Sequence, residues 1–136
     1  MTQVVKNKQS IKTINDRVYT INAFRGEKGW EFLPKLTKYV FPFIGLLGGS
    51  SEDGGMSDEE AGSALMSLLS GDNAKEITHL IKDLVSEIEV NGMKIDFSNE
   101  FEDNYDALLI LAIEVIKLNY SNSFQRLVTN LPNLLN

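Results

Sequence analysis

The chain has 136 residues, of which 43% are apolar and 24% are charged, and it contains no cysteine. This composition is typical of a globular protein, and the length suits one domain with a hydrophobic core. The lack of cysteine excludes disulfides and thiolate metal sites and suits a reducing compartment. The net charge of -6 is unevenly distributed, because residues 1–50 carry +5 and residues 51–136 carry -11. An acidic chain with scattered basic residues does not favour nucleic-acid binding.

The first predicted element is a short strand after a polar arm. Residues 1–17 are mostly polar, and we expect them to form a flexible N-terminal arm. Residues 18–24 are rich in β-branched and aromatic side chains that alternate with polar ones, which predicts a strand. The N-terminus shows no apolar signal segment, and the unbroken apolar run at residues 107–113 is far shorter than the ~20 residues of a membrane span. We therefore expect a soluble intracellular protein without a membrane partner.

Residues 31–47 are predicted to form an aromatic-rich helix after a turn at residues 25–29. Its apolar side chains recur at helical spacing. Pro34 is expected in the first turn, where a proline sacrifices no hydrogen bond, and Pro42 is expected to kink or end the helix. The helix is apolar on more than one side. We expect part of this surface to remain uncovered and to contact a protein partner.

A glycine- and serine-rich loop at residues 48–57 precedes two amphipathic helices. Ser57 and Glu60 have the spacing of a capping box, which predicts a helix that begins after Ser57 and ends at Gly71. Asn73 is the predicted cap of the next helix, whose apolar residues have the clearest three- and four-residue spacing in the chain. These residues are Ile77, Leu80, Ile81, Leu84, Val85 and Ile88.

The last third of the chain is predicted to contain a tight turn and the central helix. Asn91 and Gly92 lie between apolar residues, which predicts either a hairpin, with residues 87–96 pairing with the N-terminal strand, or a helix C-cap. Residues 104–120 predict a helix that is apolar on almost every side. Such a helix must lie at the centre of the domain or face a partner. An amphipathic stretch follows at residues 124–135.

Together these elements predict a mainly α fold, a compact bundle of four to five helices with a minor β-strand or hairpin, in a single domain over residues 18–136. Groups suited to catalysis are sparse. His79 is the only histidine and is expected at the surface, although Glu76 and Asp83 share its helix face. The acidic clusters are explained more simply as solvated surface, and the glycines at residues 45–55 lack the Walker pattern. We predict no catalytic, cofactor or metal site, and a binding or assembly protein that is not an enzyme.

Two segments resemble the tail assembly chaperones of tailed bacteriophages. The first is FRGEKGWEFLPKLTKYVFPFIG at residues 24–45, a short strand and a glycine-aromatic turn followed by Leu-Pro-Lys-Leu at the start of a helix. The second is MKIDFSNEFEDNYDALLILAIEVIKLNYSNSF at residues 93–124, in which a phenylalanine- and acid-rich segment leads into a long apolar helix. The order of the elements between them also fits, so the resemblance covers residues 18–124.

The resemblance implies a chaperone that lacks catalysis and cofactors. It implies binding to the tape measure protein, a long helical chain with apolar stripes that must stay soluble before the tail tube polymerises around it. The tail tube protein is a second candidate partner, and a homo-oligomer stays open. The implied location is the host cell cytoplasm, with absence from the mature virion. The alternatives are a small structural subunit of the virion and a regulatory adaptor that binds a host protein.

The partner surface is expected on the aromatic helix and on the C-terminal stretch, because residues 104–120 and the helix after Asn73 are expected to form the core. A helix-in-groove contact would suit a helical client. The candidate partner-binding residues are Trp30, Phe32, Leu36, Tyr39, Phe43, Phe124, Leu127 and Leu131.

Overall fold

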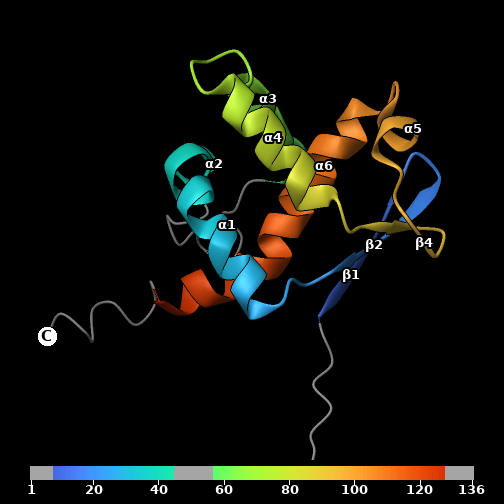
Figure 1. The fold of residues 1–136 in the computed structure, drawn as a ribbon, viewed down its shortest axis with the longest axis horizontal. Helices are drawn as coiled ribbons and strands as arrows, with labels where there is room; N and C mark the ends of the chain where they lie inside the picture. Colours follow the sequence, from blue (N-terminus) through green and yellow to red (C-terminus); the bar gives the residue numbers. More distant parts are fainter. Residues whose placement is uncertain (1–7, 45–56, 128–136) are drawn as a thin grey trace, which may run out of the picture.

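A computed structural model describes residues 8–44 and 57–127, which form six α-helices, one π-helical segment and a four-stranded antiparallel sheet. The predicted mainly α class with a minor β element is confirmed. Figure 1 shows helix α6 (Tyr105–Ile116) running through the middle of the molecule, with the other helices around it and the sheet along one side. All but the last residue of the predicted loop at residues 48–57 lies outside the described residues, as does the end of the C-terminal stretch.

The sheet has the strand order β1-β2-β3-β4, and each neighbouring pair is antiparallel. Its strands are β1 (Gln9–Ile14), β2 (Arg17–Asn22), β3 (Glu89–Val90) and β4 (Met93–Lys94). The predicted strand corresponds to β2, and its predicted pairing with the later segment is confirmed, because Tyr19 lies opposite Val90. Asn91 and Gly92 have φ values of 52° and 83°, as a two-residue hairpin turn requires, so the alternative of a helix cap is wrong.

Strand β1 lies within the arm that was predicted for residues 1–17, and the prediction of a flexible arm is wrong for this strand. Exposed and half-buried residues alternate along it, and the half-buried side includes Ser10 and Lys12. Because these inward residues are polar, the segment lacks the apolar alternation that marks a strand in a sequence. Asn15 and Asp16, with φ values of 51° and 67°, make the two-residue turn between β1 and β2.

Helix α1 (Gly26–Tyr39) begins earlier than predicted. The predicted RGEKG turn forms its first turn, and Pro34 lies in the middle of the helix, so the placement of Pro34 in the first turn is wrong. An interior proline removes an amide donor and crowds the preceding turn. Pro34 is exposed, whereas Leu36 is fully buried, so the packing of the inner face of α1 outweighs the preference of proline against a helix interior. The helix ends before Pro42, as predicted, and the chain continues as α2 (Phe41–Ile44).

Helices α3 (Asp58–Leu68) and α4 (Ala74–Val85) lie close to their predicted positions. The predicted capping box is confirmed, because the Glu60 amide donates to Ser57 Oγ at 3.0 Å and the Ser57 amide donates to Glu60 Oε1 at 2.9 Å. Asn73 precedes α4 as predicted, but its side chain makes no capping hydrogen bond. All six apolar residues of the predicted α4 stripe are buried.

Helix α6 is the centre of the core, as predicted. It packs against α3 and α4, and Leu111 and Ile113 have no exposed surface. The short helix α5 (Phe97–Phe101) precedes it, and the π-helical segment Lys117–Ser121 continues it. The whole helical stretch Tyr105–Leu127 is long and apolar enough to cross a membrane by length and composition alone. Its packing between other elements is that of the core helix of a globular domain.

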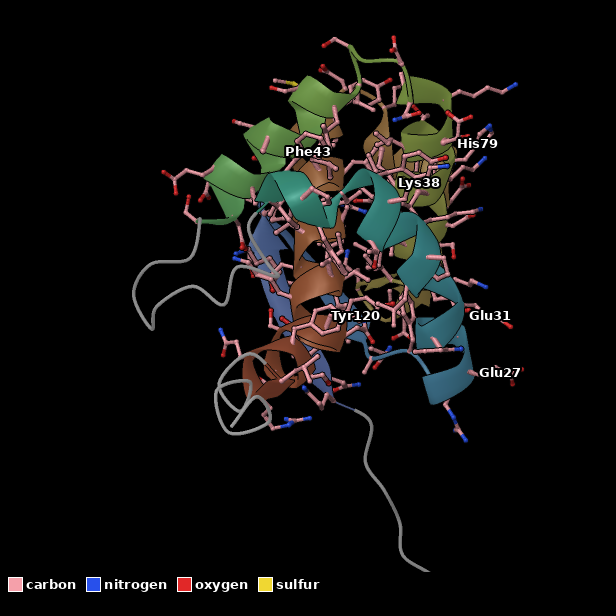
Figure 2. All side chains as sticks on the ribbon, turned by 90° about the vertical axis from the view of Figure 1, so that its left-hand side faces the viewer. Glu27, Glu31, Lys38, Phe43, His79 and Tyr120 are labelled. Atoms are coloured by element: carbon pink, nitrogen blue, oxygen red, sulfur yellow. The ribbon has the colours of Figure 1, made fainter. Side chains whose placement is uncertain are left out.

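Polar contacts attach the sheet and α1 to the helical core. Arg17 makes two hydrogen bonds to Glu100, at 2.6 and 2.7 Å, and the Tyr19 hydroxyl donates to the same carboxylate at 2.6 Å. The hydrogen bonds from Arg17 hold the pKa of Glu100 below its usual value. At the far end of α6, the Tyr120 hydroxyl donates to the Gly29 carbonyl at 2.7 Å (Figure 2). These contacts fix α5 on the sheet and α1 on the end of the central helix.

A partly buried charged cluster fixes the start of α3 to α6 and β1. Asp58 is only 9% exposed and accepts hydrogen bonds from Lys12 at 2.8 Å and Lys117 at 2.6 Å. Burial disfavours its charge, but hydrogen bonds from Glu114 and the two lysines bring the pKa of Asp58 well below its usual value. Burial, together with the hydrogen bond and charge of Asp58, raises the pKa of Glu114 to about 7. Glu114 therefore keeps its proton to near neutral pH, and Ser10 donates to it at 3.3 Å.

Replacing Leu111 by alanine should lower the free energy of unfolding by about 2–5 kcal/mol, because it leaves a cavity beside a fully buried position. Met66→Ala is the control, since Met66 is 57% exposed and the two residues have similar helix propensities. We expect the control to cost less than about 1 kcal/mol. Urea denaturation followed by circular dichroism measures both values. Equal losses would show that α6 is not the centre of the core.

The free energy of unfolding should decrease as the pH rises from about 4.5 to about 7, because the pKa of Glu114 is higher in the folded chain than in the unfolded chain. In this range the folded chain holds a proton that the unfolded chain has released, so a higher pH favours unfolding. We expect a loss on the order of 1–3 kcal/mol. Glu114→Gln should remove this dependence, because its amide cannot ionise. Denaturation at several pH values tests this, and an unchanged slope in the variant would refute it.

Candidate functional site

An open apolar groove, the α3–α6 groove, lies over α6 and is bordered by α3, α4 and α5. Its first hollow has a volume of about 350 Å³. The polar groups that line this hollow are limited to Thr78, Lys82 and the hydroxyl of Tyr105. The rest of its lining is apolar or aromatic: Met66, Leu69, Ile81, Phe97, Tyr105, Leu108 and Leu109. A second hollow of about 230 Å³ lies between α3 and α6 and shares Met66 and Leu109 with the first. The two hollows thus form one continuous surface.

Helix α3 forms one wall of the groove and passes close to α6 at Gly62. A Cβ at Gly62 would lie 3.8 Å from the Leu109 Cβ and 3.9 Å from Cγ1 of Ile110, which is an ordinary van der Waals distance. Met66 follows one turn later and remains 57% exposed. Its flexible and polarisable side chain can adapt to irregular apolar surfaces.

Phe97 of α5 and residues of α4 form the opposite wall. The Phe97 ring packs edge-to-face on the buried Phe101, with centroids 5.1 Å apart, and the Lys82 ammonium lies 5.5 Å from the Phe97 centroid. Tyr105, at the start of α6, is 63% exposed. Aromatic and methionine side chains are enriched in protein interfaces. An exposed tyrosine and methionine above a leucine floor therefore indicate a surface for a protein partner.

Three of the predicted partner-binding residues are largely exposed. Trp30 on α1 is 72% exposed, Phe43 on α2 is 54% exposed (Figure 2), and Leu127 is 58% exposed. None of them lines the α3–α6 groove. They lie outside the continuous apolar surface and form separate exposed positions.

The other predicted partner-binding residues are less accessible. Phe32, Tyr39 and Phe124 are partly buried and pack against the core. Leu36 is fully buried and offers no surface to a partner in this conformation, because it anchors α1 to the core. Leu131 lies outside the described residues.

The sequence interpretation missed the groove because it finally assigned residues 104–120 to the core and placed the partner surface on other segments. That helix was predicted either to be central or to face a partner. In the structure it is central, and one of its sides is only partly buried. Leu108 and Leu109 are partly buried residues on that side. The sequence feature that indicates the groove is the narrow polar stripe of this helix, since a core helix with one solvated face would carry a wider one.

His79 and the paired carboxyls of Asp58 and Glu114 are not among the residues that line the α3–α6 groove. In the part of the chain that the structure describes, no group of three or more histidines and acids could hold a metal ion. His79 is exposed on α4, at the outer side of the molecule (Figure 2). The paired carboxyls of Asp58 and Glu114 are engaged by Lys12 and Lys117 in the cluster that positions α3.

The comparisons with known proteins agree with this picture. The family model described as Phage tail assembly chaperone protein, TAC, matches residues 15–132, which is most of the chain. No curated protein and no solved structure matches the chain. The family is one of non-catalytic chaperones, and the match confirms the resemblance found over residues 18–124. This chain therefore belongs to the phage tail assembly chaperone proteins.

Proposed function

We propose that this chain binds the tape measure protein during tail assembly and keeps it soluble by covering apolar helical segments in the α3–α6 groove. The observation that carries this proposal is a continuous apolar surface with an exposed methionine and an exposed tyrosine on it, Met66 and Tyr105. Membership of the tail assembly chaperone family supports the role in assembly.

The groove suits a helical client because one face of an amphipathic helix can lie along it. Burial of apolar surface contributes roughly 25 cal/mol per Å², and it needs no particular sequence as long as the apolar spacing is kept. The first hollow offers few hydrogen-bonding groups, so it would accept different apolar segments of a long chain. Broad acceptance is what a chaperone for an extended client needs, and it is compatible with release when the tail tube forms.

The charge of the chain supports the same role. Residues 51–136, which include every groove residue, carry a net charge of -11. Like charges on neighbouring complexes repel one another and keep them dispersed. An apolar client covered by an acidic chaperone would therefore stay in solution.

We further propose that Trp30, Phe43 and Leu127, at separate positions outside the groove, make secondary contacts with another part of the tape measure protein or with the tail tube protein. Their exposure supports this role. Leu131 remains a further predicted contact residue.

The role that we propose places the chain in the host cell cytoplasm during assembly and excludes it from the mature virion. Mass spectrometry of purified particles should therefore detect the tail tube and tape measure proteins without this chain, while the lysate from the same infection contains it. A fixed number of copies per particle would instead support a structural subunit.

Met66→Glu should abolish or strongly weaken the complex with the tape measure protein, because a charge in the groove must lose its water when the client binds. Met66 is largely exposed and glutamate is a good helix former, so the fold should be kept. Co-expression followed by affinity purification measures the complex and the soluble fraction of the client. Trp30→Glu is the comparison variant, since Trp30 is also exposed but belongs to the secondary contacts and does not line the groove.

Each outcome of this pair has a distinct meaning. Loss of the complex only with Met66→Glu supports the groove. Loss only with Trp30→Glu would move the client to the aromatic surface predicted from the sequence. No complex with the unaltered chain, and no gain in client solubility, would contradict the proposed function.

A further inference from the structure

The two halves of the α3–α6 groove carry opposite charges. Glu59 of α3 and Asp106 of α6 are exposed and line the hollow between these two helices. Lys82 of α4 is exposed and lines the hollow next to α5. These three are the charged side chains among the residues that line the two hollows. An occupant of the groove thus meets negative charge in one half and positive charge in the other.

The three charges are available to an occupant. Asp106 accepts a long hydrogen bond of 3.4 Å from the neutral amide of Asn15, and the Lys82 ammonium lies over the Phe97 ring. In the part of the chain that the structure describes, none of the three belongs to an ion pair. Opposite charges brought by a partner would be favourable here.

We infer that the groove selects an amphipathic helix whose apolar stripe is flanked by basic residues in one half and by acidic residues in the other. This inference rests on the proposed function and specifies the client segment. The basic half of the client helix would lie between Glu59 and Asp106, and its acidic half would lie beside Lys82. The inference specifies the charge pattern along the client helix and leaves its chain direction open.

A simpler electrostatic effect makes a different prediction. The net charge of -6 attracts any basic helix at long range, whichever part of the surface it reaches. Under that effect alone, a helix with lysines in both halves binds most tightly. Under the proposed selection, a helix with lysines in one half and glutamates in the other binds most tightly.

Three synthetic helical peptides of about 14 residues, roughly 21 Å long, separate the two effects. All three carry the same leucine stripe. The mixed peptide has glutamates beside the stripe in its N-terminal half and lysines in its C-terminal half, which suits its own helix dipole. The other two peptides have only lysines or only glutamates. Isothermal titration calorimetry with the full chain at low salt should show the mixed peptide binding about threefold or more tightly than either other peptide.

Two sets of variants locate the effect in the groove. Lys82→Glu should make the all-lysine peptide the tightest ligand, and Lys38→Glu is its control because it changes the net charge equally from α1 (Figure 2). Glu59→Gln combined with Asp106→Asn should reduce the advantage of the mixed peptide over the all-glutamate peptide, because the peptide's lysines lose their partners in the groove. This neutral pair carries the test if a charge reversal disturbs folding, which circular dichroism of each variant detects.

The outcomes distinguish this inference from the proposed function. Tightest binding of the mixed peptide, with the ranking changed by Lys82→Glu and kept by Lys38→Glu, supports the inference. Equal affinities, or tightest binding of the all-lysine peptide to the unaltered chain, would overturn it and leave groove binding intact. No binding of any peptide would overturn the inference together with the groove as the client site.

Discussion

Burial of α6 is the constraint on which the rest of the structure depends. This helix is apolar on almost every side, so water must be excluded from most of its circumference. Helices α3 and α4 pack against it directly, and α5 and the sheet also contact it. A chain of 136 residues has few elements for this task. These elements bury α6 completely at Leu111 and Ile113 but only partly at Leu108 and Leu109, where the groove lies.

The incomplete side is held open by contacts elsewhere. Helix α3 is tied at its first residue by Asp58 to Lys12 and Lys117, and it touches α6 again at Gly62. From these two points its last turns carry Met66 over the exposed side of α6. On the other wall, Glu100 ties α5 to the sheet. The groove thus depends on polar contacts that lie outside it, and its floor at Leu108 and Leu109 is apolar.

The sequence predicted those elements whose local pattern and tertiary environment agree. The stripe of α4, the capping box of Ser57 and Glu60 and the Asn91-Gly92 turn each carry a pattern that the fold uses directly. The central role of α6 followed from composition alone.

The elements that the sequence did not predict depend on distant contacts. Strand β1 turns Ser10 and Lys12 inward because Glu114 and Asp58 face them, and no local pattern reveals those partners. The Asn15-Asp16 pair was the one local sign of its hairpin. Pro34 is tolerated inside α1 because the opposite side of the helix is buried. The groove is a shared property of four helices, so single-helix patterns indicate its floor but not its walls.

The position of Trp30 has a consequence for spectroscopy. It is the single tryptophan of the chain and is 72% exposed, so its emission in the folded state already resembles that of an indole in water. Unfolding would change that emission little, and fluorescence would under-report the loss of the core. A protein that covers α1 would instead exclude water from the indole and shift its emission to shorter wavelength, whereas a client confined to the groove would leave it unchanged. The chain thus contains an intrinsic optical label that distinguishes a contact on α1 from a contact in the groove.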